Sequence, residues 1–229
     1  MGLDIQAASG ANEYRDYRHS VGVSAALALA GGYLDGFTFA GHGRIFANAM
    51  TGNIVYLGME VLSSPGHPNF RHLPPLFMFM LGIWAARALH LPLFRRIVRN
   101  PYAAVLLVEI IILFLLAFLP NRTPDFWITV PITFAASMQI ITFRMVGPHT
   151  YTSTFTTGNL STLSTGLFDW LFTSDKETAR SKSRIFAIIC GSFLVGATTG
   201  SLAVTHWGNR ALIPEVILLL LIAIRVKDV

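Results

Sequence analysis

Long apolar runs alternate with short polar, charged or Pro-rich connectors along most of the chain. Each run is of the length that crosses, or nearly crosses, a lipid bilayer as a helix. The pattern therefore predicts an all-α, polytopic helical membrane protein, in which residues 1–19 form a polar tail and residues 63–75, 95–101, 120–125 and 173–184 are connectors. The runs cover residues 21–40, 45–62, 76–94, 103–119, 126–146, 151–172, 185–205 and 213–224.

Composition agrees with this class and excludes several others. Of the 229 residues, 53% are hydrophobic and 13% are charged, which is too apolar for an ordinary soluble domain. The net charge of +5 lies in loops and tails, so it bears on membrane orientation, and we expect no nucleic-acid partner. Cys190 is the one cysteine, so a disulfide within the chain and a thiolate metal site are excluded.

A Thr-Gly-Asn triplet occurs twice at matching positions. Thr51-Gly52-Asn53 closes a stretch that begins at Gly41, and Thr157-Gly158-Asn159 closes a stretch of the same length that begins at Gly147. Repetition across a long apolar sequence is typical of transporters built from two halves. We therefore expect two related membrane repeats, at residues 20–119 and 120–229.

Each triplet resembles a break in the backbone followed by a helix. Thr is a good N-cap, and Gly permits the close approach of another backbone. Such a break at membrane depth survives only where protein or a polar cavity surrounds it, so we expect the two triplets to lie near one another. The alternative is an ordinary helix with a capping Thr and a packing Gly.

The distribution of Lys and Arg separates two topologies. If both triplet segments cross the membrane, the chain has eight spans; if both re-enter, it has six full spans and two broken helices. The second topology puts more of the basic residues on the cytoplasmic side, and it makes the halves inverted with both termini inside. Gly196 and Gly200 form a small-residue pattern that indicates close helix packing or a homo-oligomer.

The order of motifs resembles the YoaK-like family of bacterial membrane proteins, which is catalogued as a domain of unknown function. The resemblance rests on Gly32-Tyr33-Leu34-Asp35, on the run from Phe46 to Asn53, and on Gln139 followed by the second triplet. It covers about residues 20 to 225. The chain departs from the family pattern at Ser137-Met138, where a Gly is expected before Gln139. The resemblance implies the bacterial inner membrane and gives no substrate.

Several polar residues lie within the apolar runs. Asp35 is predicted to couple protons or ions or to contact a substrate, and the alternative is a structural carboxyl bonded to a neighbour. Glu109 is the second coupling candidate, with snorkelling or a pair with Arg87 as the alternative. Asn48 and Gln139 are added to the two triplets as substrate-binding candidates.

These residues together favour a small permease for a polar or anionic solute, with a site at the two breaks and the lipid bilayer as its surroundings. The competing class is a non-transporting scaffold or a partner subunit of a membrane complex. No catalytic motif occurs, so we expect no enzyme, no metal and no cofactor.

Overall fold

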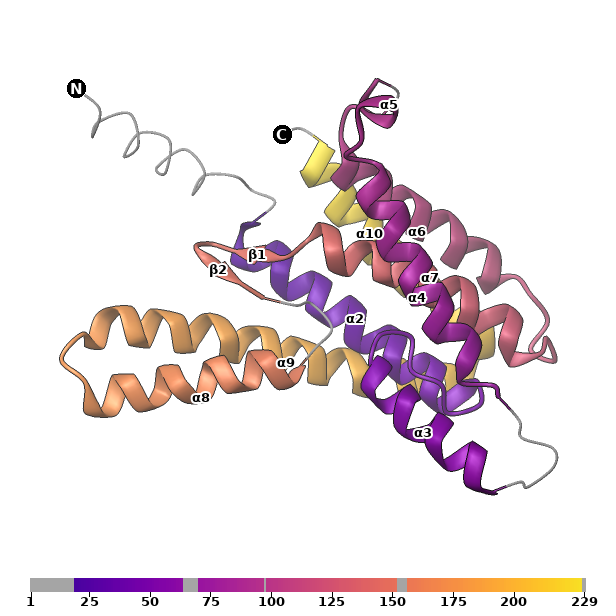
Figure 1. Cartoon of the computed structure of the whole chain (residues 1–229), viewed down its shortest axis with the longest axis horizontal. Coiled ribbons are helices and arrows are strands. Elements are labelled where there is room, and N and C mark those ends of the chain that lie inside the picture. The colour runs from indigo at the N-terminus through magenta and orange to yellow at the C-terminus, as the bar shows by residue number, and fades with distance from the viewer. Residues whose placement is uncertain (1–18, 64–69, 97, 152–155, 228–229) are drawn as a thin grey trace.

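The structure is a computed structural model, and it describes residues 19–63, 70–96, 98–151 and 156–227. The predicted N-terminal tail lies outside these residues, except for its last one. The described chain is all-α apart from one short hairpin (Figure 1). Its elements are α2 (Val21–Gly41), α3 (Met50–Ser63), α4 (Leu73–Ala88), α5 (Pro92–Arg95), α6 (Pro101–Ala117), α7 (Asp125–Thr142), β1 (Met145–Val146), β2 (His149–Thr150), α8 (Thr156–Phe172), α9 (Lys176–Trp207), η2 (Gly208–Ala211) and α10 (Leu212–Lys227).

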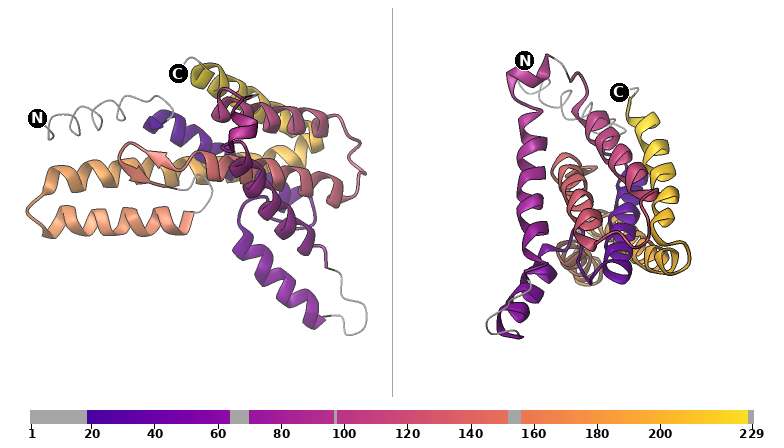
Figure 2. Two further views of the ribbon diagram at one scale, coloured as in Figure 1. Left: turned by 45° about the horizontal axis from the view of Figure 1, so that its top comes forward. Right: turned by 90° about the vertical axis from the view of Figure 1, so that its right-hand side faces the viewer.

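The core lies between α2, α6, α7 and α10. Their buried faces form one cluster, which includes Leu34, Phe37, Leu113, Ile132 and Leu219. In Figure 2, α4 stands on one side of α2 and α7, and α6 and α10 stand on the other. The apolar residues predicted to form spans therefore supply the interior of the bundle as well as much of its surface.

The helix boundaries follow local signals in the sequence. Ser20 caps α2, Asn100 caps α6 with Pro101 in the first turn, and Asp175 caps α9 through the backbone N–H of Thr178. At its other end, α9 stops at Gly208, which has a φ of +55°.

The expectation that residues 173–184 form a connector is wrong over most of its length. Helix α9 has 32 residues and begins at Lys176, so it is about 48 Å long at 1.5 Å per residue. The charged residues of its first turns are good helix formers, and the Asp175 cap starts the helix before the apolar run. With α8, this part of α9 makes a hairpin that extends away from the rest of the molecule (Figure 1).

Two helices of the described chain are both long enough and apolar enough to cross a bilayer. They are Val21–Gly41 and the apolar part of Lys176–Val226, while Leu73–Ala88 and Pro101–Ala117 are shorter apolar helices. The described helices confirm the all-α class, while the polytopic membrane protein with six full spans stays a prediction.

Candidate functional site

Asp35 binds the end of α2 to the loop that follows it. Its carboxyl group accepts a hydrogen bond from the backbone N–H of Asn48 at 2.7 Å, and the backbones of Ala47 and Ala49 hydrogen-bond to the same group. Asn48 returns a bond from its side-chain nitrogen to the carbonyl of Gly31 at 3.1 Å. The loop therefore folds back along α2, and Asp35 is a buried carboxyl with several partners.

The first half of this loop turns sharply at Gly43 and Arg44. Both residues have positive φ, at +68° and +58°, and the turn lies against Asp125 at the start of α7. His42, just before the turn, places Nδ1 3.3 Å from Oδ1 of Asp125. Burial lowers the pKa of His42, and the neighbouring carboxylate opposes that shift. The loop is thus fixed to α7 at one end and to α2 at the other.

The first triplet starts α3 and holds the loop in place. Asn53 accepts the backbone N–H of Phe46 at 2.9 Å and donates to the carbonyl of the same residue at 2.8 Å. A Cβ on Gly52 would lie 2.7 Å from the Phe46 ring, so the absent side chain leaves room for that aromatic group. Asn53 is therefore a structural clamp, and its amide is committed to the protein.

The second triplet lies in the first turn of α8, which begins at Thr156. Thr157 and Gly158 are exposed, and Asn159 is buried. A Cβ built on Gly158 meets none of the described atoms within 4 Å, in contrast to Gly52. Residues 152–155, which precede this triplet, lie outside the described chain.

One cavity brings Asp35 together with both triplet segments. Its volume is about 360 Å³, and its polar lining includes Asp35, Thr51, Thr156 and Thr157. The hydroxyl oxygen of Thr156 is buried and has no hydrogen-bond partner among the described residues. The remaining lining residues are Gly36, Phe39, Phe46, Ala49, Phe193, Ala197 and Ser201. The cavity therefore has hydroxyls from two helix starts, one carboxyl group and an aromatic wall.

The other predicted binding residues do not line this cavity. Asn48, Gly52 and Asn53 support the loop. Gly158 and Asn159 follow the lining residue Thr157 in sequence, but neither of them lines the cavity. Gln139 is fully buried in α7, and neither its amide oxygen nor its nitrogen has a hydrogen-bond partner among the residues that the structure describes.

Small residues bring α2 and α9 into backbone contact beside the cavity. A Cβ on Gly36 would lie 2.1 Å from the carbonyl oxygen of Ala197, and one on Gly196 would lie 2.0 Å from that of Leu29. Gly200 likewise faces the Tyr33 backbone. The pattern at Gly196 and Gly200 therefore packs within the chain, so it is not available for the homo-oligomer contact that it suggested.

Glu109 lies near a second buried acid, Glu215, which the sequence analysis did not single out. It does not pair with Arg87, which is exposed; the charge acting on Glu109 is that of Glu215 in α10. Both acids are 1% exposed or less, and within the described part of the chain both oxygens of Glu109 and Oε1 of Glu215 lack hydrogen-bond partners. A signal was present, because Glu109 and Glu215 are separated by the same number of residues as the two triplets.

Comparison with known proteins gives a family and nothing more specific. The model of the family described as "Protein of unknown function (DUF1275)" matches residues 23–225. No curated protein and no solved structure gave a match. Within the described ranges, no group of three or more His, Cys, Asp or Glu side chains is placed to hold a metal ion.

Proposed function

Since the chain belongs to this DUF1275 family, whose description gives no activity, we propose a function from the geometry: a small membrane permease for a polar or anionic solute. One observation carries the proposal. A single cavity of about 360 Å³ is lined by Asp35 together with Thr51 and Thr157, which come from the first turns of two separate helices.

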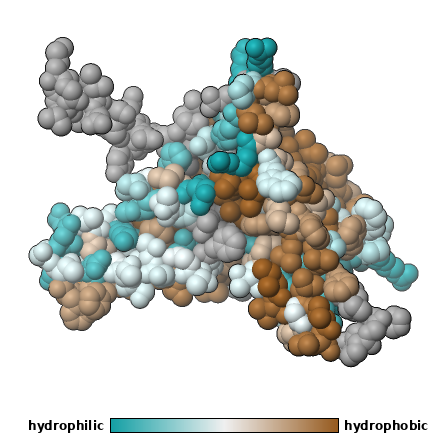
Figure 3. Space-filling view, in the orientation of Figure 1, coloured by the Kyte–Doolittle hydropathy of each residue, from teal (hydrophilic) through white to brown (hydrophobic). Residues whose placement is uncertain are grey.

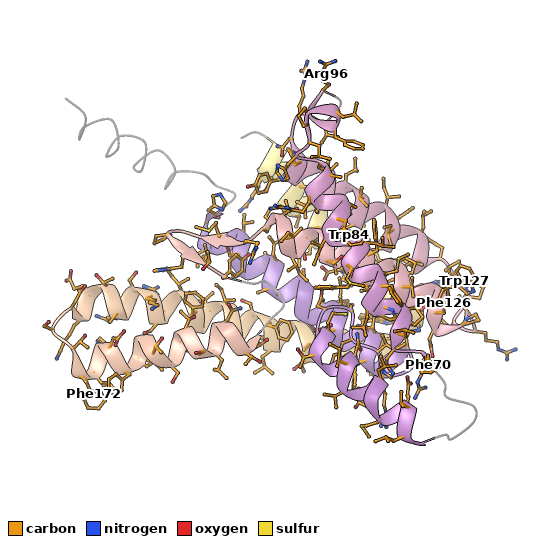
Figure 4. The ribbon with its side chains drawn as sticks, viewed as in Figure 1. Phe70, Trp84, Arg96, Phe126, Trp127 and Phe172 are labelled. Atoms are coloured by element: carbon orange, nitrogen blue, oxygen red, sulfur yellow. The ribbon has the colours of Figure 1, made fainter. Side chains whose placement is uncertain are left out.

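The exterior of the molecule supports the membrane location. Large apolar side chains are exposed on most helices, among them Leu62 at 80%, Leu93 at 71% and Leu194 at 67%. Hydrophobic residues dominate the surface over α3, α4 and α6, whereas the α8–α9 hairpin is paler and partly hydrophilic (Figure 3). Figure 4 labels Trp84, Phe126, Trp127 and Phe172, all of which are exposed. Water would disfavour such a surface, and lipid would solvate it.

Helix packing supports two related halves. Helix α2 runs parallel to α9, since Gly32 faces Phe193 and Gly36 faces Ala197. Helix α4 also packs closely on α7, where a Cβ on Gly82 would lie 2.4 Å from the carbonyl oxygen of Phe134. In the first pair, the first helix of the first predicted half (α2) packs on the third of the second half (α9). In the second pair, the third helix of the first half (α4) packs on the first of the second half (α7). Two inverted repeats would produce this reciprocal packing.

The length of α3 favours a re-entrant first triplet segment. Helix α3 has 14 residues and is therefore about 21 Å long, which is less than the hydrocarbon thickness of about 30 Å. Helix α8 has 17 residues, the same as α6, whereas α4 and α10 have 16 each, so the length of α8 does not separate the two topologies. The distribution of Lys and Arg favours re-entry of both segments, and we retain six full spans, with both termini on the cytoplasmic side of the bacterial inner membrane, as part of the proposal.

The lining of the cavity defines the chemistry of the solute. The first turns of α3 and α8 carry the partial positive charge of a helix N-terminus, and the Thr51 and Thr157 hydroxyls line the cavity there, which favours an anionic or hydrogen-bond-accepting group. Asp35 also lines the cavity, but its carboxyl group accepts the backbone N–H of Asn48 at 2.7 Å and so serves the loop. The fitting solute is small and carries an accepting or negative group, placed toward Thr51 and Thr157.

Thiol labelling combined with uptake tests the proposal. In a Cys190→Ser background, Thr51→Cys and Thr157→Cys should each react with a water-soluble methanethiosulfonate reagent in proteoliposomes. A solute from a panel of small organic anions and zwitterions should enter the vesicles and slow both reactions. Thr198→Cys, on an exposed face of α9 away from the cavity, is the control and should show no protection.

Two outcomes would reject the permease. In the first, neither cavity cysteine reacts with the reagent, which would mean that the cavity is closed to water on both sides. In the second, both cysteines react but no solute of the panel enters the vesicles, which would favour a scaffold or a partner subunit.

A further inference from the structure

A second cavity lies between α2, α9 and α10. Its volume is about 610 Å³, and its lining is mostly apolar, with Leu29, Leu202, Pro214 and Leu218 among its residues. This cavity shares no lining residue with the one at Asp35. It is large enough for a drug-sized organic molecule.

Glu215 is the acidic residue in the lining of this second cavity. The residue is 1% exposed and its Oε1 has no hydrogen-bond partner, and the Glu109 carboxyl that it acts on has none at either oxygen. Neither acid forms a salt bridge within the described residues. A buried carboxyl group with no partner is costly, and acids at membrane depth commonly serve a ligand.

The groups that face the acid pair come from every surrounding helix. Tyr33 of α2 is close enough for its phenol to be influenced by Glu215, and its hydroxyl donates to the carbonyl of Ala211. His206 of α9 lines the cavity and bonds through Nδ1 to the carbonyl of Leu202 at 2.8 Å. Arg210 of η2 is exposed and lines a neighbouring cavity, which also includes His206. Apart from Glu109, α6 and α7 contribute no charged side chain to the buried core here.

We propose that the Glu109–Glu215 pair and the adjoining cavity form a binding site for lipophilic organic cations, which exchange with a proton. The apolar lining accepts the body of the ligand, and the Tyr33 and Trp207 rings add attraction for a cationic group. On entry of the cation, one carboxyl O–H bond of the pair breaks, its proton leaves to water, and the resulting carboxylate neutralises the bound charge. The net charge of the site is unchanged by the exchange.

Two features besides the presence of two acids support this proposal. The cavity supplies space next to Glu215, and the separation between the two acids equals that between the Thr-Gly-Asn triplets. Helices α6 and α10 run antiparallel, as Asn100 donates to the carbonyl of Val226 at 3.2 Å near one end. Asn209 bonds to the carbonyl of Leu119 at 3.1 Å near the other end. The acids therefore lie on two helices that pack against each other across the contact between the two predicted halves.

Binding of tetraphenylphosphonium to the full-length protein in detergent tests the proposal without any transport assay. Calorimetry should detect binding, and an indicator dye in weak buffer should record one proton released per cation. Affinity should therefore rise about tenfold per pH unit, over the range in which the pair starts protonated. Because the experiment needs neither the Asp35 cavity nor a solute gradient, its result is independent of the proposed permease.

Three variants complete the test. Glu109→Gln and Glu215→Gln keep the shape of a neutral carboxyl. Glu215→Gln removes the acid that lines the cavity, so it should reduce cation affinity at least tenfold and abolish proton release, whereas Glu109→Gln leaves Glu215 to release the proton and should weaken affinity by a smaller factor. Leu218→Trp, which fills the cavity and leaves both acids in place, should weaken binding as well. Glu177→Gln, on an exposed turn of α9, is the matched control and should bind as the native protein does. Gel filtration confirms the fold of each variant.

The proposal is overturned if the native protein does not bind the cation. It is also overturned if binding releases no proton, or if folded Glu109→Gln and Glu215→Gln proteins bind as tightly as the native one.

Discussion

Asp35 and Glu109 are both carboxyl side chains buried in the helix bundle, but their hydrogen bonding differs. Asp35 receives backbone hydrogen bonds from residues 47–49 and fixes a loop. Glu109 receives none at either oxygen and lies near a second acid. The difference shows that burial alone does not determine whether an acid has a structural or a ligand-binding role. Its hydrogen-bond partners decide whether it supports the fold or remains available for a ligand.

The largest effect is expected at Asp35. Asp35→Ala leaves the backbone N–H groups of the loop buried and unpaired, so the free energy of unfolding should fall by about 3 kcal/mol or more. Thermal and SDS titrations of the purified protein measure this change. Asp35→Asn, which keeps an acceptor oxygen, should lose less, and Asp169→Ala in α8 is the control. A neutral Asp35→Ala would mean that the loop is held by its other contacts alone.

Replacement of Glu109 should act with the opposite sign. Glu109→Leu removes a desolvated acid and fills the same space with apolar atoms, so the free energy of unfolding should rise by about 1–3 kcal/mol. The same SDS titration measures it. Glu60→Leu is the control, because Glu60 bonds to His72 at 2.8 Å and to Arg71 at 2.9 Å and should therefore lose stability. Destabilisation of Glu109→Leu would indicate that Glu109 has a partner and would end the contrast.

The sequence predicts the helical class and most helix positions because long apolar runs carry that information directly. It also indicates the acids and the two triplets. It does not predict their partners. The bond from Asn48 to Asp35 depends on a loop that reverses at Gly43, and no periodicity in the sequence encodes that path. Asn53 could equally have faced a cavity or its own loop, and only the fold settles that choice.

Glu215 was missed for a different reason. It lies at the start of a short apolar run, where an acid suggests an interfacial position or a helix start. Its burial depends on η2, which brings the start of α10 against α6 by the bonds of Asn209 to Leu119 and Asn121. The equal separation of the two acids and the two triplets was readable in the sequence, but it gains weight only once α6 and α10 are in contact.

A smaller loss of stability is expected at Asn53. Asn53→Ala removes both bonds to the Phe46 backbone, and the free energy of unfolding should fall by about 1–2 kcal/mol. Thermal unfolding in detergent measures the loss. Asn53→Asp keeps the acceptor for the Phe46 N–H and should recover part of it. If Asn53→Ala instead keeps full stability and loses only solute binding, the amide serves the cavity and the structural assignment is wrong.

The smallest effect on stability is expected at the cavity hydroxyls, where the effect on function should be clearest. Thr51 and Thr157 are exposed, so Thr51→Val and Thr157→Val should each change the free energy of unfolding by no more than about 0.5 kcal/mol. Each loses one hydroxyl from the polar lining beside Asp35. A hydrogen bond contributes about 1 kcal/mol, so a solute held by that hydroxyl should bind about fivefold more weakly.

Thermal unfolding measures the stability of these variants, and protection of the cavity cysteines measures solute binding, with Thr198→Val as the matched control. The roles of Asp35 and of these hydroxyls are then distinct, since the acid stabilises the loop and the hydroxyls bind the solute. A Thr51→Val protein that unfolds easily and still binds normally would reverse that division.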